Sequence, residues 1–110
     1  MAVNVAVGCQ VALQGPLDVL TVSDVRATLH AAIDAGTGDL VVDVSAVELV
    51  DATGMGVLVG ANRRAALAGR RLVLRGVPPR LARILRVTRL YRVLAVEPSA
   101  PGELNPVALA

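Results

Sequence analysis

The stretch from Val41 to Gly60 constrains the fold most strongly, because it joins a buried strand to a helix through a short polar segment. It begins with a run of valines, and β-branched apolar residues without alternation are typical of a central strand covered on both faces. Asp51 and Thr53 follow, and a helical apolar pattern begins at Gly54. Because the first turn of a helix has unpaired N–H groups, Thr53 lies where a hydroxyl can either cap the helix or carry a phosphate.

Strands and helices alternate in the remainder of the chain. Apolar alternation or short apolar runs predict strands at residues 2–7, 10–14, 39–44, 72–74 and 93–96. Helical spacing predicts helices that begin at Thr21, at Gly54 and at Pro79, and Gly15-Pro16 is expected to end the second strand. Each helix has a single apolar stripe. We therefore expect an α/β domain with a mixed sheet of four or five strands and helices packed mainly on one face.

A chain of 110 residues has room for one domain, which we assign to residues 1–97. Three prolines within residues 98–110 argue against a further full helix, so a loosely ordered tail is expected there. Tyr91 is the only aromatic residue, and aliphatic side chains must therefore build the core. Without an apolar run long enough to span a bilayer or a signal-peptide pattern, we expect a cytoplasmic protein that makes no membrane contact.

The residue types do not support an enzyme. One histidine and one cysteine cannot form a typical metal site, and no phosphate-binding glycine loop is present. Thr53 lacks a plausible histidine base, so no catalytic residue and no cofactor are expected. All eleven basic residues are arginines, ten of them after residue 60, and those on the third helix form a stripe. Two interpretations of the stripe remain open, a solvated face and an anion-binding surface. Direct nucleic-acid binding is poorly supported, because the net charge is only +2 and the single aromatic residue, Tyr91, gives no aromatic interleaving among the arginines.

Four segments of the chain resemble the STAS domains of bacterial anti-sigma-factor antagonists. The residues from Asp43 to Val47 match a "DLS-x-V" strand end, and those from Asp51 to Gly56 match "D-S-S/T-G-L-G" with Ala52 in place of the first hydroxyl. Residues 15–18 resemble the family's "G-x-L-D" step. Residues 79–94 resemble "P-x-V-x-x-I-L-x-x-T-G-L-D-x-x-F" but depart from it at Arg89 and Tyr91, where Gly and an acid are usual.

The resemblance implies a STAS-like fold and a phosphoacceptor at Thr53. The partner-binding residues that it implies, or that surround Thr53, are Asp18, Asp51, Ala52, Gly54, Met55, Gly56 and Val59. For Asp18, a capping carboxylate in a turn is an equal alternative. Met55 and Val59 are expected either to pack against a neighbouring helix or to form an apolar patch beside Thr53.

The resemblance further implies a monomer or weak dimer that binds an anti-sigma-factor kinase when unphosphorylated and thereby regulates sigma-factor-dependent transcription. The kinase would use ATP to phosphorylate Thr53, and a phosphatase would reverse the modification. The alternative is a non-phosphorylated STAS scaffold, or a subunit of a larger assembly such as a transport complex. A module that binds a small ligand is a third interpretation.

Overall fold

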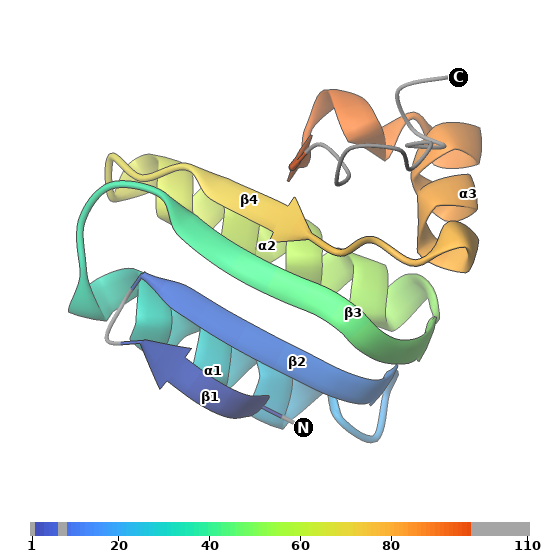
Figure 1. Ribbon diagram of the computed structural model, residues 1–110, viewed down its shortest axis with the longest axis horizontal. Coiled ribbons are helices and arrows are strands. Elements are labelled where there is room, and N and C mark those ends of the chain that lie inside the picture. Colours follow the sequence, from blue (N-terminus) through green and yellow to red (C-terminus); the bar gives the residue numbers. More distant parts are fainter. Residues whose placement is uncertain (1, 7–8, 98–110) are drawn as a thin grey trace.

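A computed structural model describes residues 2–6 and 9–97, and the expected tail at residues 98–110 lies outside the described residues. The described chain alternates strands and helices as far as a short last strand (Figure 1). The elements are β1 (Ala2–Ala6), β2 (Gln10–Leu17), α1 (Val22–Ala35), β3 (Leu40–Val50), α2 (Ala52–Leu67), β4 (Leu72–Arg75), α3 (Pro79–Thr88), the 3-10 helix η1 (Leu90–Arg92) and β5 (Ala95–Val96).

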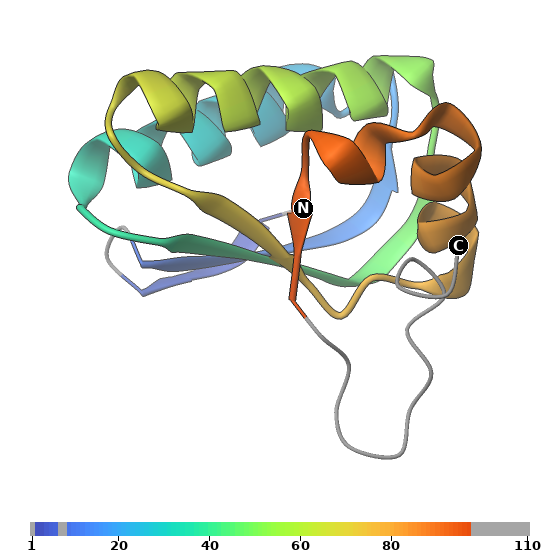
Figure 2. The same cartoon turned by 90° about the horizontal axis from the view of Figure 1, so that it is seen from above.

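The five strands form one sheet in the order β1-β2-β3-β4-β5. β1 is antiparallel to β2, and the other neighbours are parallel, which confirms the mixed sheet. α1 and α2 lie side by side on one face, while α3 lies beyond the ends of β3 and β4 (Figures 1 and 2). The expectation of helices mainly on one face is therefore confirmed.

The core lies between the sheet and its two covering helices and consists of aliphatic side chains. Every second residue of β2 and of the first half of β3 points toward the helices, which follows from the two-residue period of a strand. The largest fully buried side chains of the whole core come mainly from strands and helices: Leu13, Leu17, Leu29, Ile33, Leu40, Leu58, Leu72, Leu74, Leu85 and Leu94.

β3 continues well beyond residue 44, where the sequence predicted its end. Its pairing with β2 moves from Ala12–Asp43 to Gln14–Ala46, so β3 uses one residue more than β2 over this interval, and a second shift of the same kind follows before Leu17. Such bulges disturb the alternation of apolar and polar residues from which a strand is recognised. They also increase the twist, and the ends of β2 and β3 curve toward the helices (Figure 2).

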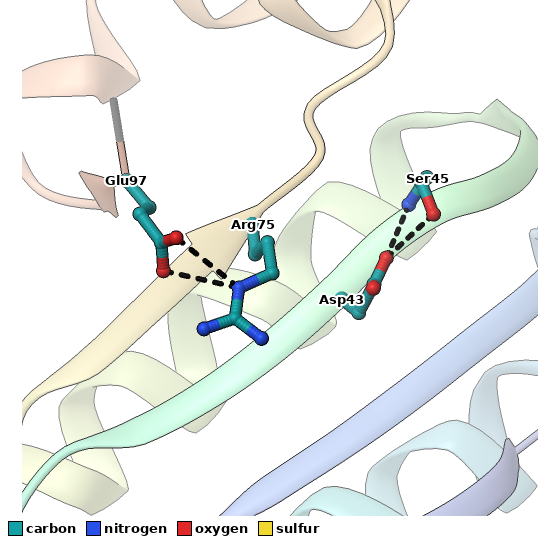
Figure 3. Close-up of polar contacts among 4 residues, drawn as sticks. All are labelled: Asp43, Ser45, Arg75 and Glu97. Carbon is teal, nitrogen blue, oxygen red and sulfur yellow. Dashed lines mark hydrogen bonds and ion pairs between the residues drawn. The ribbon is translucent and has the colours of Figure 1, made fainter. Parts of the chain in front are cut away.

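Asp43 stabilises the first bulge. Its Oδ1 accepts hydrogen bonds from the Ser45 backbone N–H at 2.9 Å and from the Ser45 hydroxyl at 2.7 Å (Figure 3). A bulge leaves a backbone donor without a partner in the ladder, and the carboxylate supplies the missing acceptor. The same view shows Arg75, at the end of β4, paired with Glu97 through Nε at 3.1 Å.

β2 also extends past its expected end, through Gly15-Pro16 to Leu17. Gly15 adopts a left-handed backbone conformation with φ +76° at the second register shift, which a glycine allows without strain. Proline lacks an N–H but is tolerated at such an irregularity. The expected strand break is therefore wrong, and the extension brings Leu17 beside Val50 immediately before α2.

Arg70 joins the end of α1 to the segment that leads into β4. The side chain is buried, and its guanidinium donates to the carbonyl oxygens of Ala32 at 3.0 Å, Ile33 at 2.9 Å and Gly38 at 2.8 Å. The last carbonyls of a helix have no partner within the helix, so this arginine acts as a cap from a distant part of the sequence.

Candidate functional site

Asp51 is the N-cap of α2. Its Oδ1 accepts a hydrogen bond from the Gly54 N–H at 2.8 Å, and its own N–H donates to the Leu17 carbonyl at 3.2 Å. The first contact satisfies one of the unpaired donors of the helix, and the second fixes the helix start against the end of β2. The carboxylate itself is exposed at this end of the sheet.

Thr53 is the second residue of α2, and its side chain is exposed. Because Asp51 occupies the cap position, the alternative in which Thr53 caps the helix is wrong. Within the described part of the chain, the Thr53 hydroxyl makes no hydrogen bond. The fold therefore leaves this hydroxyl accessible at the positive end of the α2 dipole, next to a carboxylate.

Gly54 and Gly56 differ in their surroundings. Gly54 is buried, and a Cβ at this position would overlap the Leu17 carbonyl oxygen, so a side chain would push α2 away from β2. At Gly56 a Cβ would meet no atom within 4 Å, and the residue is exposed. A close backbone approach thus occurs within the chain at Gly54, whereas Gly56 leaves an open surface.

Met55 and Val59 lie where α2 faces α3. Met55 is buried, Val59 is half-buried, and both belong to or pack against the core. They line an open groove of about 530 Å³ between the two helices. The groove is lined by Val50, Asp51, Ala52, Met55, Gly56, Val59, Ile84, Thr88 and Leu90. Met55 and Val59 thus pack on the core and at the same time line an apolar hollow beside the α2 start.

Asp18 closes the loop between β2 and α1. Its Oδ1 accepts from the backbone N–H groups of Leu20 at 2.9 Å and Thr21 at 3.2 Å. These are the contacts expected if the Asp18 carboxylate caps the backbone N–H groups of the turn. The loop adjoins Leu17, which contacts both Asp51 and Gly54, so Asp18 borders the same end of the sheet.

Three exposed apolar side chains border the α2 start, and the sequence did not single them out. Val19 is 68% exposed and Leu20 88% exposed in the loop after β2, and Leu49 is 45% exposed near the end of β3. Because β2 and β3 end together, these side chains lie at the same edge as Thr53. The sequence did contain one signal. Val19 and Leu20 are adjacent apolar residues in the turn that Asp18 closes, and packing in the core does not account for apolar side chains there.

The arrangement can bind a partner and present a hydroxyl, and its acidic side chains do not gather into a metal site. Among residues 9–97 no group of three His, Cys, Asp or Glu side chains could hold a metal ion. In the same range no helix is both long and apolar enough to cross a bilayer. What the edge combines is an accessible hydroxyl, a carboxylate, exposed apolar side chains and a groove.

Known proteins are similar to this chain in sequence and in fold. A family model described as Mlab, STAS domain, matches residues 3–96. The chain is 31% identical over 87 residues to the anti-sigma-B factor antagonist of Staphylococcus aureus (strain NCTC 8325 / PS 47), covering 79% of this chain and 81% of that relative. The fold of this chain is similar to that of an RsbS variant from Moorella thermoacetica. The TM-score is 0.67 and the identity 30%, covering 99% of this chain and 94% of the RsbS chain.

The fold is also similar to that of the Bacillus cell fate determinant SpoIIAA in its phosphorylated form. The TM-score is 0.63 and the identity 23%, covering 90% of this chain and 91% of SpoIIAA.

Proposed function

The chain belongs to the STAS domain family, and we propose that it is an anti-sigma factor antagonist controlled by phosphorylation of Thr53. In its unphosphorylated form it binds an anti-sigma factor kinase, and the sigma factor held by that kinase is released for transcription. The kinase uses ATP to phosphorylate Thr53, which dissociates the complex, and a phosphatase restores the binding form. In this role the protein is a regulator without catalytic activity of its own.

The observation that carries the proposal is the Thr53 hydroxyl, which the fold leaves exposed and does not use. Asp51 already caps α2 through the Gly54 N–H, so phosphorylation costs the helix no hydrogen bond. The unpaired N–H groups of the first turn tolerate an anion, and a kinase can reach the side chain without local unfolding. The site is therefore stable in both states.

The partner surface surrounds this hydroxyl. Ala52 and Gly56 lie beside it with small or absent side chains, and the exposed Leu20 and Leu49 supply apolar contact area from the neighbouring loops. A kinase that packs on this surface covers Thr53. Burial of the apolar atoms provides the affinity, and the small residues allow a close approach of the partner backbone.

Phosphorylation changes the charge of this surface in one step. A phosphate adds about 1.5–2 negative charges and three acceptor oxygens. Next to the Asp51 carboxylate, these charges remain hydrated in the free protein but lose their water in the complex, where they also repel each other. The binding equilibrium then shifts toward the free form.

The experiment compares the wild type, Thr53→Ala and Thr53→Glu against candidate kinases encoded by the same genome. We expect the wild type and Thr53→Ala to bind one kinase and Thr53→Glu to fail, with ATP-dependent phosphate found by mass spectrometry on Thr53 alone. Circular dichroism checks that each variant is folded. If no kinase binds or modifies the chain, the switch is wrong and the scaffold interpretation takes its place.

A further inference from the structure

Charge is strongly segregated along this chain. Residues 52–96 contain ten of the eleven arginines and none of the nine acidic residues. Arg64 and Arg75 form ion pairs with Asp34 and Glu97, and Arg70 is buried in hydrogen bonds. The five arginines of α3 and η1 are exposed, and no ion pair joins them to a described residue: Arg80, Arg83, Arg86, Arg89 and Arg92. The arginine stripe of α3, together with Arg89 and Arg92 after it, is thus a concentrated positive surface.

One of these arginines, Arg80, lines a hollow that adjoins the groove between α2 and α3, and Arg83 lies on the next row of α3. Arg80 precedes the groove residue Ile84 by four positions and lines the adjoining hollow with Ile84 and Glu48, so Arg80 and Ile84 lie on one side of α3. Glu48 is the acidic residue of this hollow, and the remaining exposed arginines of the α3 region outnumber it. Arg83 and Val87 form the next row, and Val87 is 73% exposed. The groove therefore has an apolar floor and a rim that combines positive charge with further apolar surface.

From this combination we propose that the groove and its rim bind an acidic amphipathic segment of a partner protein. Apolar side chains of the segment lie against Met55, Val59, Ile84 and Leu90, and its carboxylates face Arg80 and Arg83. A helix laid in a groove presents apolar residues at three- and four-residue spacing, which suits a hollow of about 530 Å³ between two helices. The positive rim attracts such a segment and selects against neutral or basic ones.

Other anionic partners fit these features less well. Nucleic-acid binding uses aromatic side chains for stacking or a basic face alone, whereas here the floor is apolar and Tyr91 is the only aromatic residue. A membrane-bound amphipathic helix inserts its apolar side into the lipid, but the apolar side of α3 is buried in the protein through Leu81, Ala82 and Leu85. An acidic protein segment uses both the apolar floor and the charged rim.

Asp51 and Ala52 line the α2 end of the same groove. If Thr53 is phosphorylated, as proposed above, the added charge stands at that end and repels an acidic segment. This coupling rests on the proposed function, whereas binding of the segment by the unmodified chain does not. The two can therefore fail separately.

The test measures binding of the full chain to a synthetic 20-residue peptide by fluorescence anisotropy. The peptide carries leucines at three- and four-residue spacing and glutamates on the remaining face, and a control peptide has glutamine in place of every glutamate. We expect the acidic peptide to bind more weakly as salt is raised, and the double variant Arg80→Glu with Arg83→Glu to raise its Kd at least about tenfold. NMR shift changes should centre on Met55, Ile84 and Leu90.

Arg71→Glu, compared with Arg80→Glu alone, is the matched control, because Arg71 is exposed before β4 and each of these single substitutions changes the net charge by the same amount. We expect Arg71→Glu to change the Kd by less than about threefold. Equal binding of the two peptides, equal effects of Arg71→Glu and Arg80→Glu, or no binding overturns the proposal. Binding to duplex DNA or to vesicles containing phosphatidylglycerol, but not to the acidic peptide, also overturns it and assigns the rim to that other partner.

Discussion

Two glycines in the first turns of α2 differ in how closely other atoms pack against them. Gly54→Ala forces a methyl group onto the Leu17 carbonyl oxygen, and we expect it to destabilise the fold by about 2–3 kcal/mol. Gly56→Ala meets open space in a helix, and we expect it to stabilise the fold by about 0.5–1 kcal/mol. Urea unfolding of both variants measures the difference. Equal effects of the two substitutions would show that the contact between α2 and Leu17 is not tight.

A second residue-scale prediction concerns Arg89, which ends α3 in the left-handed conformation with φ 61°. An L side chain is strained there, and glycine is the usual residue at such a helix end. We expect Arg89→Gly to raise the free energy of unfolding by about 0.5–1 kcal/mol. The control Arg86→Gly, within the helix, should lower it by about 1 kcal/mol. A loss of stability in both variants would contradict the interpretation.

The residues of the candidate site were partly predictable. Thr53, Asp51 and the two glycines could be placed at a helix start because N-caps, glycines and apolar periodicity are local signals. The sequence could not decide whether Asp51 or Thr53 is the cap, since both types are good caps. It also left Val19, Leu20 and Leu49 unnoticed, because only the parallel pairing of β2 with β3 brings their loops together.

At the scale of elements, Arg70 holds the end of α1 through carbonyl oxygens on residues more than thirty positions away. Arg70→Ala leaves these carbonyls without their buried donor, and we expect a loss of about 3 kcal/mol in thermal or urea unfolding. Arg71→Ala, at the exposed neighbouring position, should change stability by less than about 0.5 kcal/mol. If both substitutions have the same small effect, Arg70 does not cap α1.

The ion pair between α1 and α2 gives a prediction for pH dependence. Arg64 donates to Asp34 at 2.8 Å, and this hydrogen bond holds the pKa of the Asp34 carboxyl below its ordinary value. A carboxyl whose pKa is lower in the folded state stabilises the fold above its unfolded pKa, and the contribution disappears as the pH falls through the folded value. We expect Asp34→Asn to be less stable than the wild type at pH 7.

The difference between wild type and Asp34→Asn should begin to shrink as the pH falls below the ordinary aspartate pKa of about 3.9, and it should vanish as the pH falls through the lower pKa of the folded state. The midpoints of urea unfolding of both proteins, measured from pH 7 to pH 3, report this difference in stability. Because both side chains are exposed, the effect should be small and should decrease in high salt. A midpoint difference that stays constant over this range would exclude the carboxyl as its source.

Elements were predicted well where their patterns are regular. Val25, Leu29 and Ile33 recur at helical spacing and are buried in α1 as expected. The second half of β3 was missed because two bulges interrupt its alternation, and the end of β2 because Gly15-Pro16 is more often a turn than a bulge. Arg70 was missed because its partners are distant in the sequence.

At the scale of the whole molecule, parallel strands place the loops that precede α1 and α2 at one edge of the sheet. Thr53 and the exposed apolar side chains therefore lie at one edge, and the groove between α2 and α3 lies beside it. The opposite edge, where Arg70 lies, stabilises the fold. Under the proposed function, this division lets a charge change at Thr53 alter binding without unfolding the domain.

The measurement that tests the switch most directly is the Kd of the cognate kinase for this chain before and after complete phosphorylation of Thr53, by isothermal titration calorimetry. We predict at least about tenfold weaker binding of the phosphorylated chain, since about 1.5–2 added charges beside Asp51 must be desolvated in the complex. Treatment with a phosphatase should restore the original Kd. An unchanged Kd, with phosphate present on Thr53, would contradict the proposed function.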